Sequence, residues 1–141
     1  MPAMIGLVQR GDQPMLRICL SVAIFLPSVA MADEIKIDGR WNTANGFMMI
    51  SRLDTGEYAI AFDKYAGKTV GILADNVLSG TWQDVAKTKP CSAEQNGSAY
   101  WGTFSISFYG PPAVKKPAFQ GILAFCENQN EGSNFSGELA D

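Results

Sequence analysis

Histidine is absent from the 141-residue chain, which removes every reaction that requires an imidazole. Ser-His-Asp and Cys-His nucleophile systems and HExxH zinc sites are among the excluded classes. Basic residues are also few, with 11 lysines and arginines against 14 acidic residues, and they are scattered along the chain. A partner with a phosphate backbone requires a basic stripe, so we expect no nucleic acid among the partners.

The acidic residues also give little indication of a catalytic site. Two carboxylates that face each other across a cleft can hydrolyse glycosides. In this chain nearly all of the acidic residues considered lie in or beside expected turns, where Asp and Glu favour turn formation and solubility. They are Asp54, Glu57, Asp63, Asp75, Asp84, Glu94, Glu127 and Glu131. The chain also lacks a cluster of cysteines and histidines that could hold a metal. We therefore predict no enzyme, no cofactor and no metal site.

No apolar run reaches the roughly 20 residues that a membrane-spanning helix requires. The apolar run from Ile18 to Leu26 follows an arginine and precedes an Ala-Met-Ala pattern, as in a secretory signal peptide. We expect residues 1–32 to be this signal, with an extended leader or upstream sequence before Met15; a retained membrane anchor is the alternative. Residues 33–141 are then one domain, secreted or periplasmic, with no stable membrane insertion after the signal is removed.

Cleavage after Ala32 would remove Cys19 and leave Cys91 and Cys126. Two cysteines in an exported chain form an obvious pair, so we expect one disulfide. Two separate buried thiols are the alternative. The bond would close a loop of about 35 residues, which corresponds to roughly 3 to 4 kcal/mol of stability in the chain-entropy model.

Turn residues recur at short intervals after Gly39, with β-branched and aromatic residues between them, which is typical of an all-β domain. No amphipathic helix of useful length is present. Tight turns are expected at Asn45-Gly46, Asp54-Thr55-Gly56, Ala66-Gly67 and Asp75-Asn76, so neighbouring strands should run antiparallel. The expected strands are 36–44, 46–52, 57–63, 68–74, 77–84, 99–109, 118–126 and 133–139.

Four segments share the pattern apolar-x-Gly-x-apolar, whose three defined positions lie on one face of a strand. They are Ile37-x-Gly39-x-Trp41, Leu78-x-Gly80-x-Trp82, Phe119-x-Gly121-x-Leu123 and Phe135-x-Gly137-x-Leu139. A glycine at the centre leaves room for a neighbouring ring and permits the coiling of a closing sheet. Eight short strands can remove their edges by closure, so we predict a single antiparallel up-and-down β-barrel of about eight strands; a two-sheet sandwich is the alternative.

The expected hairpin of strands 99–109 and 118–126 places Cys126 near Tyr100. The segment 85–98 enters at the same end of this hairpin. A Cys91–Cys126 bond would therefore fasten that long polar loop to one rim of the barrel.

The stretch Gly39-Arg40-Trp41-Asn42-Thr43-Ala44-Asn45-Gly46, together with Leu78-Ser79-Gly80-Thr81-Trp82 and Phe119-Gln120-Gly121, resembles the rhythm of avidin-type barrels and, more loosely, of lipocalin-like ones. The resemblance implies a fold rather than a ligand. The avidin positions that present Asn and Ser to biotin fall on Thr43 and Phe47. Phenylalanine cannot replace the hydrogen bonds of a hydroxyl, so biotin binding is not implied.

Trp41, Trp82, Trp101 and Tyr58 are the candidate ligand-binding residues, because aromatic rings at a barrel mouth often hold a flat or sugar-like ligand. For Trp41 and Trp82 the alternative is packing beside the pattern glycines. Trp101 lies on the more polar face of its strand, so it is either an exposed binding ring or a lid on the disulfide.

Two functions follow. The first is an exported binding protein that takes a small apolar or aromatic ligand at the barrel mouth. The alternative is a protein-binding inhibitor of an exported hydrolase, which would dock through loops 85–98 and 110–117. Lys115 and Lys116 are its candidate contact residues, unless they simply form a solvated hairpin tip. A completely filled interior would favour the inhibitor, and a cavity would favour the binding protein.

Overall fold

The computed structural model describes residues 35–85, 87, 89–128 and 132–141. The predicted signal peptide lies outside these residues. Eight strands are present in the described part, and no helix occurs there. They are β1 (Gly39–Thr43), β2 (Gly46–Arg52), β3 (Tyr58–Phe62), β4 (Tyr65–Ala74), β5 (Val77–Gln83), β6 (Trp101–Tyr109), β7 (Ala118–Phe125) and β8 (Ser133–Leu139).

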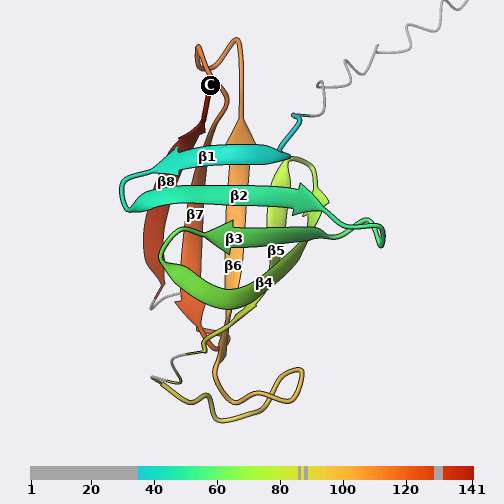
Figure 1. The fold of residues 1–141 in the computed structure, drawn as a ribbon, viewed down its shortest axis with the longest axis vertical. Coiled ribbons are helices and arrows are strands. Elements are labelled where there is room, and N and C mark those ends of the chain that lie inside the picture. Colours follow the sequence, from blue (N-terminus) through green and yellow to red (C-terminus); the bar gives the residue numbers. More distant parts are fainter. Residues whose placement is uncertain (1–34, 86, 88, 129–131) are drawn as a thin grey trace, which may run out of the picture. The chain divides into compact units, whose positions relative to one another are not determined.

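The eight strands form one closed antiparallel barrel. Each strand pairs with the next along the chain, and β1 closes the sheet on β8 through pairs such as Trp41 with Leu139. In Figure 1, β1 to β3 cross the view while β6 to β8 run up and down it, as tilted strands of a closed sheet do. The predicted up-and-down barrel is confirmed, and the sandwich alternative is wrong. The result is consistent with the resemblance to avidin-type barrels at the level of fold.

One predicted turn is wrong. Asp63 and Lys64 form the turn between β3 and β4, whereas Ala66 and Gly67 lie inside β4. The register of this pair shifts between Ile60 and Phe62, and Phe62 pairs with Tyr65 directly across the two-residue turn. Gly67 instead allows the Tyr65 ring and the backbone oxygen of Gln83 to approach the β4 backbone closely, because a Cβ at this position would overlap both of them.

Glycines make room for rings inside the sheet, as the sequence pattern predicts. Gly121 lies directly opposite Phe135 in the register, and Gly137 lies opposite Phe119. An added Cβ would come within 2.6 Å of the facing ring at either glycine. Large rings can therefore turn inward and fill a barrel this narrow.

The barrel has two unlike ends. The mouth is the end that carries the β1–β2 and β3–β4 turns and the β5–β6 and β7–β8 connections. At the opposite end Trp41 contacts Phe108 and Phe119, with ring centroids 5.1 and 5.7 Å apart, and its indole Nε1 donates to the backbone oxygen of Ile37 at 2.9 Å. Trp41, Ile106 and Phe119 have no exposed surface, so this end is solidly packed.

The predicted disulfide is confirmed. Cys91 and Cys126 are bonded, with their Cα atoms 5.5 Å apart. The amide of Cys126 donates to the backbone oxygen of Trp101 at 3.0 Å, and that of Cys91 to Ala99 at 2.6 Å. Cys126 therefore lies beside the start of β6, and the bond fastens the β5–β6 connection to the mouth as expected.

Candidate functional site

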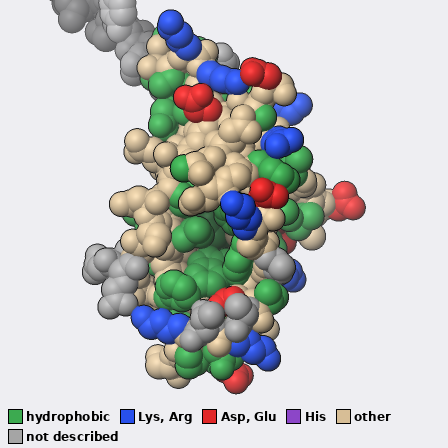
Figure 2. All heavy atoms as spheres, turned by 60° about the vertical axis from the view of Figure 1, so that its left-hand side comes forward, with side chains coloured by type: hydrophobic (Ala, Val, Ile, Leu, Met, Phe, Trp, Pro, Cys, Tyr) green, Lys and Arg blue, Asp and Glu red, His purple; other side chains and the backbone are tan. Residues whose placement is uncertain are grey.

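The mouth of the barrel contains a cavity of about 320 Å³, which we call the mouth cavity. Its walls come from seven strands, all except β6, and from the β1–β2 and β3–β4 turns. They are Thr43, Asn45, Phe47, Phe62, Asp63, Lys64, Tyr65, Thr69, Trp82, Leu123, Phe125 and Ser133. Figure 2 shows hydrophobic side chains gathered around a hollow on this side of the molecule.

The cavity wall is a chain of aromatic rings centred on Trp82. Its indole meets Phe125 at a centroid distance of 5.1 Å and Tyr65 at 6.0 Å, both edge to face. Tyr65 in turn meets Phe62 at 6.1 Å. These rings hold one another in orientation, because edge-to-face pairs are favourable beyond the area that they bury. The cavity is therefore a preformed apolar surface.

The polar atoms of these rings are bonded to the protein. The Trp82 Nε1 donates to the backbone oxygens of Thr103 and Ala124, each at 3.2 Å. The Tyr65 hydroxyl donates to the backbone oxygen of Gln83. Because both donors point away into the sheet, the rings offer carbon surface to whatever enters the cavity.

Burial raises the pKa of Tyr65 to about 12, and the negative charge of Asp84 acts in the same direction. Between the ordinary value of 10.0 and this value, the folded chain keeps a proton that the unfolded chain loses. The contribution of Tyr65 to the free energy of unfolding is therefore complete below pH 10 and is lost as the pH rises towards 12.

Tyr65→Phe should therefore make the fall in stability between pH 10 and pH 12 less steep than in the wild type. Urea unfolding midpoints across this range measure the effect, and the tyrosinate absorbance change near pH 12 should disappear in the variant. An equally steep decline in both proteins would contradict the effect of burial on Tyr65.

The charged groups lie at the rim, and all but one of the polar residues lie there too; the exception is Thr69, which is buried on β4. Asn45, Asp63 and Lys64 lie in the β1–β2 and β3–β4 turns, and Ser133 begins β8. The Thr43 hydroxyl donates to the backbone oxygen of Gly46 at 3.1 Å. The cavity thus combines a polar edge with an apolar wall, as sites for small organic ligands do.

The structure separates the four predicted ligand-binding residues. Trp82 lines the mouth cavity, whereas Trp41 is fully buried at the opposite end and Tyr58 is buried in the core. Trp101 is only 5% exposed, and its Nε1 donates to the backbone oxygen of Ala93 at 2.9 Å. Trp101 is therefore covered by the loop that the disulfide holds, which matches the lid interpretation.

Several residues that line the mouth cavity are not among the predicted ligand-binding residues. Phe125 follows from the alternation of β7, because it continues the inward series of Phe119, Gly121 and Leu123. Tyr65 was hidden by the misplaced turn at Ala66-Gly67. Thr43 and Phe47 were not among the predicted ligand-binding residues either, and both line the mouth cavity.

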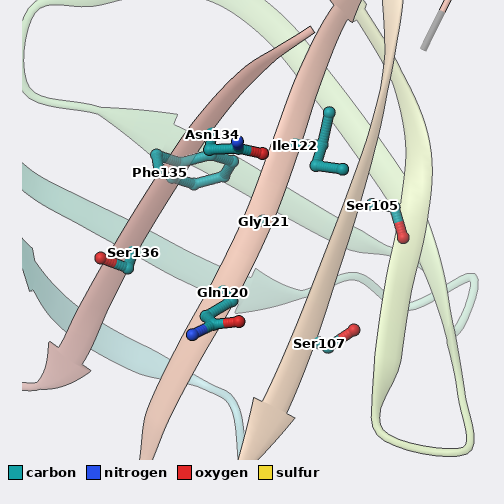
Figure 3. Close-up of a pocket in the computed structure, with 8 residues that line it drawn as sticks. All are labelled: Ser105, Ser107, Gln120, Gly121, Ile122, Asn134, Phe135 and Ser136. Atoms are coloured by element: carbon teal, nitrogen blue, oxygen red, sulfur yellow. The ribbon is translucent and has the colours of Figure 1, made fainter. Parts of the chain in front are cut away.

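A second hollow, of about 570 Å³, lies over β6, β7 and β8. Figure 3 shows its side chains spread along the three strands, and five of the eight carry hydroxyl or amide groups. They are Ser105, Ser107, Gln120, Asn134 and Ser136, with Gly121, Ile122 and Phe135 as the other lining residues. Phe135 is the single aromatic residue that lines this larger hollow, whereas five aromatic residues line the mouth cavity, which is therefore the better candidate for an apolar ligand.

The two loops of the inhibitor alternative lie at opposite ends of β6. That strand has nine residues and therefore spans about 30 Å. Figure 1 shows the β5–β6 and β6–β7 connections at the two extremes of the molecule. In the β6–β7 loop, Lys115 is exposed and Lys116 forms a 2.6 Å ion pair with Asp141. The two loops do not form one contiguous contact surface.

Within the described ranges, no group of three or more His, Cys, Asp and Glu residues could hold a metal ion. No helical segment of the length and hydrophobicity needed to span a bilayer occurs in them either. Comparisons with protein-family models, curated proteins and solved structures found no match to this chain.

Proposed function

We propose that this protein is a small exported binding protein that takes a small apolar or aromatic ligand at the mouth of its barrel. The observation that carries the proposal is the mouth cavity, whose aromatic wall has its polar atoms bonded elsewhere. Its volume of about 320 Å³ lies at the lower end of the range for ligand pockets, so the ligand is small.

The packing of the barrel supports a site at the mouth rather than one deep inside. Ile60, Phe104 and Ile106 point inward and are buried, so the middle of the barrel is filled. At the mouth, Phe62 and Leu123 are only partly buried, and Phe125 is 36% exposed. Apolar side chains that remain accessible in a concavity are typical of a binding site.

Export and the absence of catalysis belong to the same proposal. The Cys91–Cys126 bond supports export, because disulfides persist mainly in oxidising compartments. The chain has no imidazole that could activate a nucleophile. The inhibitor of an exported hydrolase stays a prediction, and no contact among the described residues favours it.

Titration with N-phenyl-1-naphthylamine, a neutral aromatic dye that fluoresces in apolar surroundings, tests the proposal. We expect saturable binding by the wild type and about tenfold weaker binding by Phe125→Ala, which removes a ring that packs on Trp82. Ile72→Ala is the matched control, since Ile72 is an apolar side chain on β4 that is 62% exposed and does not line the cavity. A wild type that binds no dye would overturn the proposal.

A further inference from the structure

Among the described residues, Thr69 is the one buried residue with a polar aliphatic side chain, and it lines the mouth cavity. It is only 2% exposed, and its hydroxyl has no hydrogen-bond partner among the residues that the structure describes. In the register of the sheet Thr69 pairs with Trp82 on β5 and with Ile60 on β3. The Cβ atoms of residues paired in this way lie about 5 Å apart, so Thr69 lies next to Trp82, the central residue of the cavity wall.

An unpartnered hydroxyl in this place is costly to the folded chain. A buried polar group without a partner has lost its hydrogen bonds to water on folding, and no hydrogen bond within the protein replaces them. Valine has nearly the same shape and would fill the same space without that loss. The described residues supply no partner for this hydroxyl, so a bound molecule that offers one would gain a hydrogen bond.

The surroundings of Thr69 favour an uncharged partner. Trp82 and Tyr65 present carbon surface, and the burial that holds Tyr65 in its neutral form would also disfavour a charged group on a ligand. The charged residues among the cavity walls, Asp63 and Lys64, both lie in the turn at the rim.

We propose that the Thr69 hydroxyl is the polar anchor of the mouth cavity, and that the ligand is an uncharged aromatic molecule with one hydroxyl or carbonyl group on the end that enters the barrel. This inference rests on the proposed function and narrows its ligand class. The rings centred on Trp82 hold the flat body of the ligand. A hydroxyl can donate or accept, so Thr69 can pair with either group.

The test compares two probes of almost equal shape, 2-naphthol and naphthalene, by equilibrium dialysis against the purified protein. The measured quantity is the ratio of their dissociation constants. We expect Thr69→Val to reduce the preference for 2-naphthol about five- to tenfold, because the variant removes one hydrogen bond and little volume. Thr69→Ser keeps the hydroxyl and should retain the preference of the wild type.

Thr103→Val is the matched control. The Thr103 hydroxyl is also buried without a partner, but Thr103 lies outside the mouth cavity. This variant should leave the ratio unchanged. A charged probe of the same shape, 2-naphthoate, should bind at least about tenfold more weakly than 2-naphthol. Equal or tighter binding of 2-naphthoate would overturn the uncharged ligand class.

The outcomes separate the two proposals. If both naphthalene and 2-naphthol bind but the ratio is the same in the wild type and in Thr69→Val, Thr69 is not the anchor and the apolar site stands. If neither probe binds the wild type, both the site and its anchor are refuted. A ratio that falls in Thr103→Val as much as in Thr69→Val would also overturn the role of Thr69, since the effect would then not depend on the cavity.

Discussion

Gly102→Ala is expected to destabilise the barrel by about 3 kcal/mol or more, the upper range for overpacking in a closed core. A Cβ at Gly102 would lie 2.0 Å from the backbone oxygen of Ala124 and 2.4 Å from the Trp82 ring. Neither neighbour can move freely. The Ala124 oxygen belongs to β7 and accepts the Trp82 Nε1, and the same Nε1 also donates to Thr103 on β6.

Gly110→Ala is the control for this substitution. A Cβ at Gly110 would find only Ile35 within 4 Å, at the ordinary contact distance of 3.7 Å. Urea unfolding should therefore show a change within about 0.5 kcal/mol for Gly110→Ala and a large loss for Gly102→Ala. Trp82 fluorescence should also shift in the latter, because the ring must turn. Equal stabilities in the two variants would show that the sheet can spread at Gly102 without cost.

The glycine positions show which parts of the fold can be predicted from the sequence. The pattern apolar-x-Gly-x-apolar predicts inward glycines, and the facing rings at Gly121 and Gly137 confirm it. However, a glycine can indicate either a turn or a close contact within a strand. Ala66-Gly67 is equally compatible with a turn and with a close approach of Tyr65, and only the register of β3 with β4 decides between them.

The candidate site was predictable only in part, for a similar reason. Trp41 and Trp82 occupy the same place in the same sequence pattern, yet one is sealed at the packed end and the other lines the mouth cavity. The difference depends on how far along the barrel each strand places its tryptophan. That follows from the stagger of all eight strands, which local periodicity does not contain. The isolation of the Thr69 hydroxyl likewise depends on neighbours from other strands.

Loss of the Cys91–Cys126 bond is the second large effect that we expect. The bond joins residues 35 positions apart, and in the chain-entropy model a closed loop of this length corresponds to about 3 to 4 kcal/mol. For a domain of this size, that corresponds to a fall in Tm of about 10 to 20 °C. The double variant Cys91→Ser with Cys126→Ser should show this loss in calorimetry, as should the wild type in excess reductant.

The two single variants distinguish a bond from two separate thiol contacts. If the stabilisation comes from the covalent link, Cys91→Ser and Cys126→Ser alone should each lose about as much stability as the double variant, because either change breaks the same bond. Two independent packing effects would instead add.

The disulfide also affects the mouth cavity, since Cys126 directly follows Phe125, whose ring packs on Trp82. Reduction should therefore weaken binding of the neutral dye as well as stability, whereas unchanged dye affinity in the reduced, folded protein would show that Phe125 is held in place by the sheet alone.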